Sequence, residues 1–267
     1  GAIAALAMAM ACQAGAPSSA SAQPAPGSML RLAAPIVTWD EAIPLGNGLL
    51  GGLVWGGPSD LNISLDGFAT TTDQTPEEPF GQDWGRLVEH YAATRTFRER
   101  VLHDASGEGT TGIDDDYAAA YFAEVGAEIM GAGMFGLHNH PDDPDWRGWW
   151  GDEPPFRVPV FVLTHTPRPT IEMAGGTTFH FLSATPAEAL DKALAVAGGK
   201  DVRIGGGPTV VRQFLKAGLV DQLHVAIVPI LLGRGIRLWD DLRGLESGYR
   251  VKVEAAPSGT THLTFRR

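Results

Sequence analysis

Three consecutive glycines near the C-terminal end are the residues of this chain best suited to hold a cofactor. Residues 201–204 predict a short buried strand, residues 205–209 (GGGPT) a turn, and residues 210–219 a helix. A glycine backbone can approach a ligand closely because it has no Cβ, and Pro208 suits the first turn of a helix. The helix N-terminus offers N–H groups and a positive dipole end to an anion. The unit predicts either a seat for a dinucleotide pyrophosphate or a tight turn without a ligand.

The residues after this turn extend the pattern. The helix ends near Gly218, residues 222–229 alternate like a strand, and residues 231–235 form a second glycine turn. With the segments 64–68, 129–135 and 160–166, this pattern resembles the dihydrofolate-reductase-like superfamily. More narrowly, it resembles the reductase domain of the bacterial bifunctional riboflavin-pathway deaminase-reductase and its stand-alone relatives. The resemblance covers about residues 60 to 267.

The expected fold class is α/β: a three-layer α/β/α sandwich with a mixed central sheet, dihydrofolate-reductase-like. Strands alternating with helices support it, and a C-terminal hairpin adds antiparallel pairing. The expected strands are 61–64, 128–131, 158–163, 177–182, 250–255 and 261–266, and the expected helices are 85–103, 117–124 and about 185–197.

The resemblance implies NADPH as the cofactor, although NADH stays open. It implies diphosphate contacts at Gly205, Gly206, Gly207, Pro208 and Thr209, and further cofactor contacts at Met130, Gly131, Gly133, Thr164, His165 and Thr166. A nicotinamide cofactor supplies a hydride, and the protein orients it and excludes water. Arg168 is either a partner for a 2′-phosphate or a solvated loop residue.

The substrate implied by the resemblance is a pterin, a pyrimidine or a related flat heterocycle. Asp66, Phe68 and Trp150 are the expected substrate-binding residues, and Asp66 is the catalytic candidate. Asp66 would orient a substrate amine or relay a proton, or else would only cap its own turn before Gly67. Riboflavin-pathway reductases usually carry a Glu where this chain has Gly205, which puts that pathway's substrate in doubt. No fused deaminase is expected, because the H-x-E…C-x-x-C zinc pattern is absent.

The loop at 137–156 combines His138 and His140 with several carboxylates and three tryptophans. A metal site is one interpretation, but proline-broken loops rarely fix ligand geometry, and we expect no metal. A solvated acidic loop pinned by its tryptophans is a second interpretation. We favour a third, in which the loop forms a substrate-pocket wall or a subunit contact.

The N-terminal part has a different character, so we expect three regions. Residues 1–28 form a truncated signal-like, low-complexity leader. Residues 29–60 resemble the N-terminus of α-L-fucosidase-type glycoside hydrolases without their catalytic region, and residues 61–267 form the reductase domain. The glycines at 46, 48 and 51 match G-x-G-x-x-G only by spacing, since no helical pattern follows. A chain starting near Gly57 is expected to fold.

The composition limits the kinds of molecule that this protein is expected to bind. The net charge of −11 over 267 residues disfavours nucleic-acid and anionic-membrane surfaces. The single Cys12 excludes an intrachain disulfide, which suits a cytoplasmic reductase body, whereas the leader suggests secretion or lipoprotein anchoring. No apolar run reaches the length of a membrane-spanning helix. A homodimer is expected from the resemblance and from the apolar strand 222–229, unless helices of the same chain cover both its faces.

These patterns together predict an NADPH-dependent reductase acting on a small heterocyclic molecule. The alternative is a catalytically idle nucleotide-binding or dimerisation domain on a lipoprotein-like leader. A third, weaker reading is a carbohydrate-binding fragment built from residues 30–60.

Overall fold

The structure is a computed structural model that describes residues 61–70, 72, 75, 81, 83–166 and 168–267, and the backbone of 53–55. The predicted leader, the glycines at 46, 48 and 51, and most of the hydrolase-like segment lie outside the described residues. The predicted domain boundary near residue 60 therefore stays a prediction.

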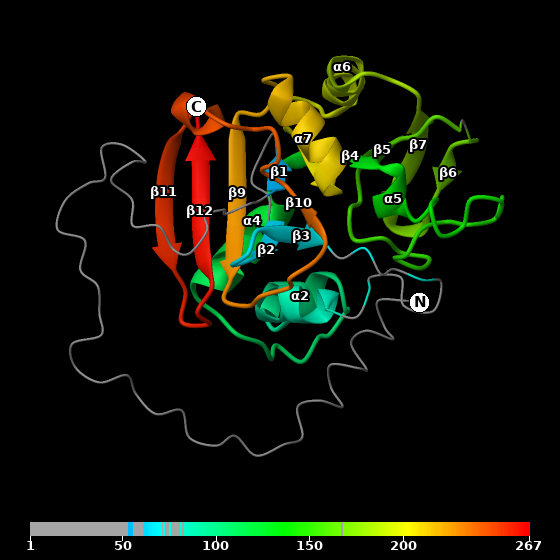
Figure 1. The fold of residues 1–267 in the computed structure, drawn as a ribbon. Coiled ribbons are helices and arrows are strands. Elements are labelled where there is room, and N and C mark those ends of the chain that lie inside the picture. Colours follow the sequence, from blue (N-terminus) through cyan, green and yellow to red (C-terminus); the bar gives the residue numbers. More distant parts are fainter. Residues whose placement is uncertain are drawn as a thin grey trace, which may run out of the picture.

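The described strands form two five-stranded sheets (Figure 1). The first is antiparallel through β11 (Arg250–Ala255), β12 (Thr261–Arg266) and β9 (Gln222–Val228). On the side of β9 opposite β12, the first residues of β9 pair antiparallel with β1 (Leu53–Trp55) and the later residues pair parallel with β2 (Leu61–Ser64). The second sheet has the order β8 (Asp201–Gly206), β4 (Val125–Gly131), β5 (Pro159–Leu163), β7 (Thr178–Leu182) and β6 (Ile171–Glu172).

All pairs of the second sheet are parallel except the edge pair β6–β7. Strand β1 also lies against β8, so the two sheets adjoin there. A short ladder joins β3 (Phe68–Thr70) to β10 (Ile236–Arg237). This confirms the mixed α/β fold with parallel and antiparallel pairing.

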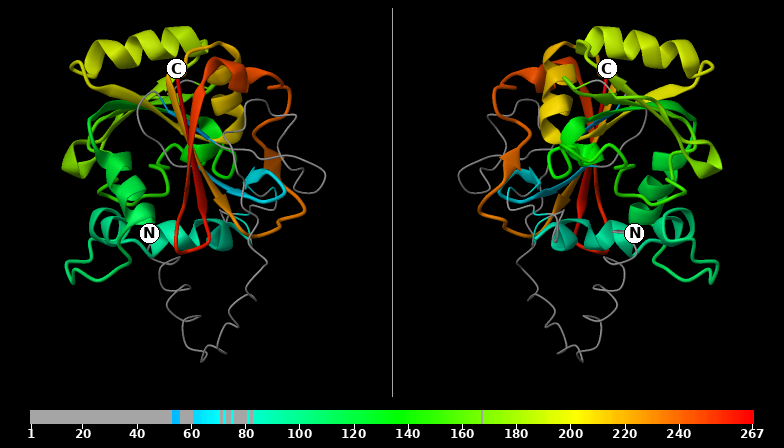
Figure 2. Two further views of the ribbon diagram at one scale, coloured as in Figure 1. Left: turned by 90° about the vertical axis from the view of Figure 1, so that its left-hand side faces the viewer. Right: turned by 90° about the vertical axis from the view of Figure 1, so that its right-hand side faces the viewer.

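Helices cover both faces of the sheets. On one face, α6 (Pro186–Val196) and α7 (Pro208–Lys216) share the main hydrophobic core with alternate residues of the strands, such as Ile129, Ile204 and Leu223. The helices α2 (Trp84–Ala92), α3 (Arg95–Arg100), α4 (Ile113–Phe122) and α5 (Ala132–Phe135) complete the set of α-helices in the described part of the chain. Both views of Figure 2 place α6 near the C-terminus and α2 at the opposite end of the sheets.

The central strand β9 is buried on both faces by its own chain. Leu223 and Val225 face the main core, whereas His224 points the other way and stacks against Tyr117 of α4. The structure therefore shows that the same chain covers both faces of this apolar strand, which was the alternative to burial in a dimer interface. The composition of β9 alone gives no support to a homodimer.

Two helix predictions need correction. The single helix expected at 85–103 is two helices, α2 and α3, because Thr94 takes an extended conformation and its hydroxyl accepts the N–H of Phe97, capping α3. The helix expected from Tyr117 begins earlier, at Ile113, so the three aspartates lie inside its first turn, where they favour the positive dipole end. None of the described helices is long and apolar enough to cross a membrane.

Removing β1 should loosen the first sheet without unfolding the domain. A chain starting at Gly57 lacks β1 and leaves the edge of β9 at Gln222–His224 unpaired, whereas a chain starting at Leu50 keeps it. We expect both to melt cooperatively, with the shorter chain melting several degrees lower, since about 1 kcal/mol corresponds to about 2–4 °C in a domain of this size. Circular dichroism melting measures this. A non-cooperative melt of the shorter chain would contradict the boundary predicted near residue 60.

Candidate functional site

Parallel pairing brings the carboxyl ends of three strands to one edge of the second sheet. Gly131 at the end of β4 pairs with Leu163 at the end of β5, and Met130 pairs with Gly206 at the end of β8. The three segments predicted to contact a cofactor, 130–133, 164–166 and 205–209, lie at these ends or directly after them. The structure therefore brings these segments to the same edge of the sheet, where ligands bind in open parallel sheets.

The turn between β8 and α7 has the predicted strand–turn–helix form. Gly206 has a φ of +105°, a conformation that few residues other than glycine adopt, and the Gly206–Gly207 peptide is cis. Gly207 is the helix N-cap in an extended conformation, and Pro208 stands in the first helical turn. The first amides of a helix have no intrahelical acceptor, so the amide of Thr209 can serve a ligand.

The glycines of the β4 segment serve packing as well as access. A Cβ on Gly131 would lie 2.7 Å from Cγ2 of Val210, so glycine lets α7 approach β4. A Cβ on Gly133 would lie 3.0 Å from Nδ1 of His138. The side chain of Met130 is fully buried in a second hydrophobic cluster. Only the backbone of Met130 is placed to face the edge.

The third segment is held by its own hydrogen bonds. The amide of Thr164 donates to the carbonyl of Leu182 at 2.8 Å, which continues the β5–β7 pairing. The hydroxyl of Thr164 accepts the amide of Thr166 at 3.1 Å. His165 and Thr166 are exposed at the edge.

Asp66 fastens two turns together. Its carboxylate accepts the amides of Leu232 at 3.1 Å and Gly233 at 2.6 Å. Partial burial raises the pKa of Asp66, but hydrogen bonds from Ser64 and from these amides outweigh burial, so the pKa lies below its ordinary value. The residue is therefore an ionised anchor between the turn after β2 and the glycine turn at 231–235.

The two predicted aromatic substrate residues pack into the protein. Phe68 joins a small cluster with Leu87 and Val228, and the guanidinium of Arg237 lies 4.6 Å from its ring centroid. Trp150 packs against Phe156 and Phe179 in the second hydrophobic cluster, with ring centroids 4.8 and 5.9 Å away.

The 137–156 loop is pinned by its tryptophans, as its second interpretation held. The indole of Trp146 donates to the carbonyl of Phe135 at 2.9 Å and stacks on His140 with centroids 3.7 Å apart. Arg168 donates to the carbonyl of Asp143 in this loop. Across the described residues, no group of three His, Cys, Asp or Glu side chains is arranged to hold a metal.

A buried ion pair beside the turn that is predicted to bind the cofactor was missed in the sequence analysis. Glu128 of β4 and Arg203 of β8 are register partners, both almost inaccessible, and the guanidinium donates to the carboxylate. Arg203 also donates to the carbonyl of Tyr121 and lies over its ring, 3.8 Å from the centroid. Burial raises the pKa of Glu128 although the Arg203 charge opposes it. The sequence does contain a sign of this pair, because Glu128 and Arg203 are charged residues inside otherwise apolar parts of β4 and β8.

This pair explains the unusual glycine at position 205. A Cβ on Gly205 would lie only 2.0 Å from Oε1 of Glu128, so the carboxyl group of β4 occupies the space that a side chain at 205 needs. A glutamate, which the family resemblance implies at this position, has no room here.

The fold and the edge geometry define a mixed α/β domain in which three turns meet at the carboxyl edge of a parallel sheet. The chain belongs to the RibD C-terminal domain family, whose model matches residues 59–261. It is similar in fold to a putative riboflavin biosynthesis protein from Shewanella sp. PV-4, with 23% identity, a TM-score of 0.50 and coverage of 78% of this chain and 96% of that one. RibD of Acinetobacter baumannii shows 16% identity and a TM-score of 0.42, with coverage of 79% and 58%.

Among curated proteins, the uncharacterized protein YyaP of Bacillus subtilis (strain 168) is 30% identical over 67 residues. That match covers 25% of this chain and 36% of YyaP, so it spans about a third of the curated relative.

The contact with Glu128 predicts that neighbouring glycines respond differently to alanine. Gly205→Ala should lower the free energy of unfolding by about 1–3 kcal/mol, because its Cβ collides with a buried carboxyl group that cannot move freely. Gly207→Ala is the matched control, since no atom lies within 4 Å of its Cβ, and it should stay within about 0.5 kcal/mol of the parent. Urea unfolding measures both. Equal stability of the two variants would contradict the packing of Glu128 against Gly205.

Proposed function

We propose that this protein is an NADPH-dependent reductase of a pterin, a pyrimidine or a related flat heterocycle. The observation that carries the proposal is the convergence of the turns 130–133, 164–166 and 205–209 at one edge, with the N-terminus of α7 among them. Membership of the RibD C-terminal domain family supports the same reaction class.

The residues of the turn after β8 fit a diphosphate. No atom lies within 4 Å of the position of a Cβ on Gly207, so the backbone there is open to an approaching ligand. The α7 N-terminus favours negative charge, and no acidic side chain occupies its first turn. When bound, NADPH would supply the hydride, and the amides of α7 would hold its diphosphate at this edge.

Asp66 would influence the substrate indirectly, by holding the turn at 231–235 in place, and not by transferring a proton. Its lowered pKa keeps it ionised near neutral pH, so it cannot donate a proton there, and two backbone amides already occupy its oxygens. We propose that it fixes the turn at 231–235, which lies beside the end of β2. Gly205 carries no side chain, and the Glu128 carboxyl group beside it is buried against Arg203, so a ribityl chain finds no accessible carboxylate there. The substrate is therefore proposed only as a class.

NADPH binding should depend on the backbone at Gly207. Gly207→Val places a branched side chain where the diphosphate would lie, and its extended conformation accepts any residue, so the fold should persist. Gly206 is a poorer test because its positive φ would strain a valine whatever the ligand does. We expect the Kd for NADPH to rise at least about tenfold, which is about 1.4 kcal/mol, in a fluorescence titration.

Gly248→Val is the control for this titration, because Gly248 also has open space around its Cβ but lies far along the chain in a 3₁₀ turn. It should bind NADPH like the parent. Unchanged binding by Gly207→Val would place the site elsewhere. Binding without NADPH consumption across pterin and pyrimidine substrates would favour the idle nucleotide-binding domain.

We further propose a homodimer formed through the edge strand β11. Val251 and Val253 are 37% and 60% exposed on the face of β11 that continues the main core. Light scattering at micromolar concentration should give twice the 28.3 kDa mass of one chain. Val253→Lys should shift the mass to that of one chain, whereas Val196→Lys, a similarly exposed valine on α6, should not. A parent mass of one chain would refute the dimer.

A further inference from the structure

One face of the first sheet carries a row of basic side chains. Arg250 of β11 is the direct register partner of Arg266 of β12, which in turn pairs with Gln222 of β9. The next row on the same face consists of Lys252, Thr264 and His224. Because alternate residues of a strand share a face, these side chains all project to the same side of the sheet.

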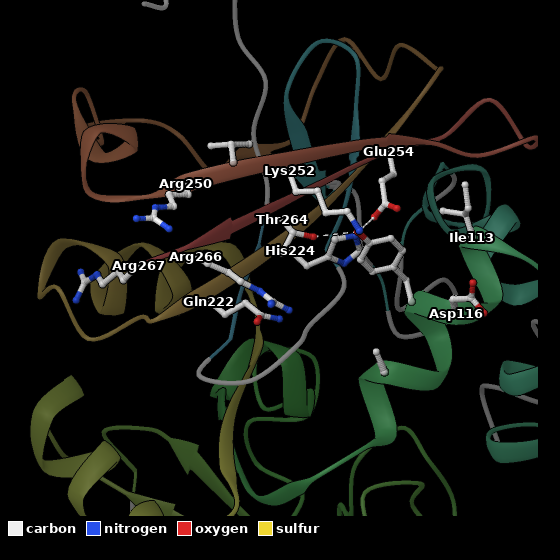
Figure 3. A pocket seen from close by; sticks show the side chains of 13 residues that line it. Ile113, Asp116, Gln222, His224, Arg250, Lys252, Glu254, Thr264, Arg266 and Arg267 are labelled. Carbon is white, nitrogen blue, oxygen red and sulfur yellow. Dashed lines mark hydrogen bonds and ion pairs between the residues drawn. The ribbon is translucent and has the colours of Figure 1, made fainter. Parts of the chain in front are cut away.

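Helix α4 covers only the inner part of this face. The ring of Tyr117 stacks on His224 and His262, with centroids 4.0 and 4.4 Å away, and its hydroxyl contacts Glu254 and Thr264. His262 also contacts Asp114 of α4 at 2.9 Å. The outer row with the two arginines lies beyond these contacts, and Figure 3 shows Arg250 at the end of the pocket away from Ile113 and Asp116.

The two arginines repel each other. Like charges directly opposite across a strand pair destabilise the sheet. In the part of the chain that the structure describes, no carboxylate forms an ion pair with Arg250 or Arg266, while Lys252 is paired with Glu254 at 2.7 Å. Arg250 and Arg266 are therefore neighbours across the strand pair, with no ion-pair partner among the described residues, in a protein whose net charge is −11. Figure 3 shows their guanidinium groups at separate positions along the pocket.

These side chains line a pocket of about 590 Å³ between the β11–β12 hairpin and α4, here called the hairpin pocket (Figure 3). Its floor includes the buried side chains of His224 and Thr264, and its rim carries Arg250, Lys252 and Arg266. This volume lies within the range of small-molecule sites. Figure 3 shows Gln222 and Arg266 extending on the same side of the strands.

We propose that the hairpin pocket binds the phosphate group of a small molecule. Both arginine side chains are exposed and line the pocket, so their guanidinium groups can turn toward one phosphate dianion and bind its oxygens in a forked geometry. The Gln222 amide adds a further donor. The bound dianion removes the repulsion between Arg250 and Arg266, so binding stabilises the hairpin. The pocket is built from β9, β11, β12 and α4, none of which supplies a residue to the edge proposed for NADPH.

The test measures the melting temperature of the full chain with inorganic phosphate, at constant ionic strength maintained with sodium chloride. At a phosphate concentration about tenfold above its Kd, the parent should melt about 3–6 °C higher. Arg266→Gln and Arg250→Gln should each lose most of this shift. Arg243→Gln, which removes one exposed arginine outside the pocket, should keep it.

Two further measurements separate this site from a folding defect and from the NADPH site. Without phosphate, Arg266→Gln should melt no lower than the parent, because it removes a like-charge pair. Gly207→Val should keep the phosphate shift. The proposal is overturned if both pocket variants keep the shift, if sodium chloride alone reproduces it, or if Gly207→Val abolishes it.

Discussion

The register between β4 and β8 depends on one buried ion pair. Glu128 and Arg203 are opposite each other, with side chains 0% and 2% exposed, and hydrogen bonds tie the carboxylate to the guanidinium. Leaving either charge buried without its partner costs about 3–5 kcal/mol. A slip of one strand by one residue would also turn one of the two side chains to the opposite face of the sheet, away from its partner. The pair therefore selects a single alignment of the two strands.

That alignment decides what stands at the carboxyl edge. Glu128 lies opposite Arg203 and Ile129 opposite Ile204; a one-residue register shift then brings Met130 opposite Gly206, where the turn of β4 meets the turn that opens α7. The same carboxyl group fills the space beside Gly205. One interaction thus accounts for the register up to Ile129 and for the lack of room for a side chain at Gly205, and the register shift that follows brings the two glycine turns together.

The two faces of β9 have different surroundings. One face belongs to an apolar core with α6 and α7, and the other to a polar network of His224, His262, Tyr117 and Asp114. Buried polar groups need hydrogen-bond partners, so this network specifies how α4 sits on the sheet. Among the described residues, α4 does not reach the outer end of the hairpin, where the exposed side chains of Arg250, Lys252 and Arg266 lie.

Local patterns in the sequence determined much of this fold. The hairpin strands, the capping box at Thr185 that opens α6, and the strand–glycine–helix unit at 201–216 match their predictions closely, because each depends on neighbouring residues. The break at Thr94 was missed because a single capping residue inside a helical pattern is a weak signal.

The candidate site likewise combines features that the sequence predicts with features that only the structure shows. The sequence by itself identified the glycine turns that meet at one edge. Only the tertiary structure showed that Asp66 anchors a distant turn, that Trp150 packs in a core, and that Glu128 fills the space at Gly205. The physical reason is that glycine turns and caps are set by local backbone conformation. The roles of Glu128 and Asp66 are instead set by partners that lie 75 to 167 residues away along the chain, and the role of Trp150 is set by the rings packed around it.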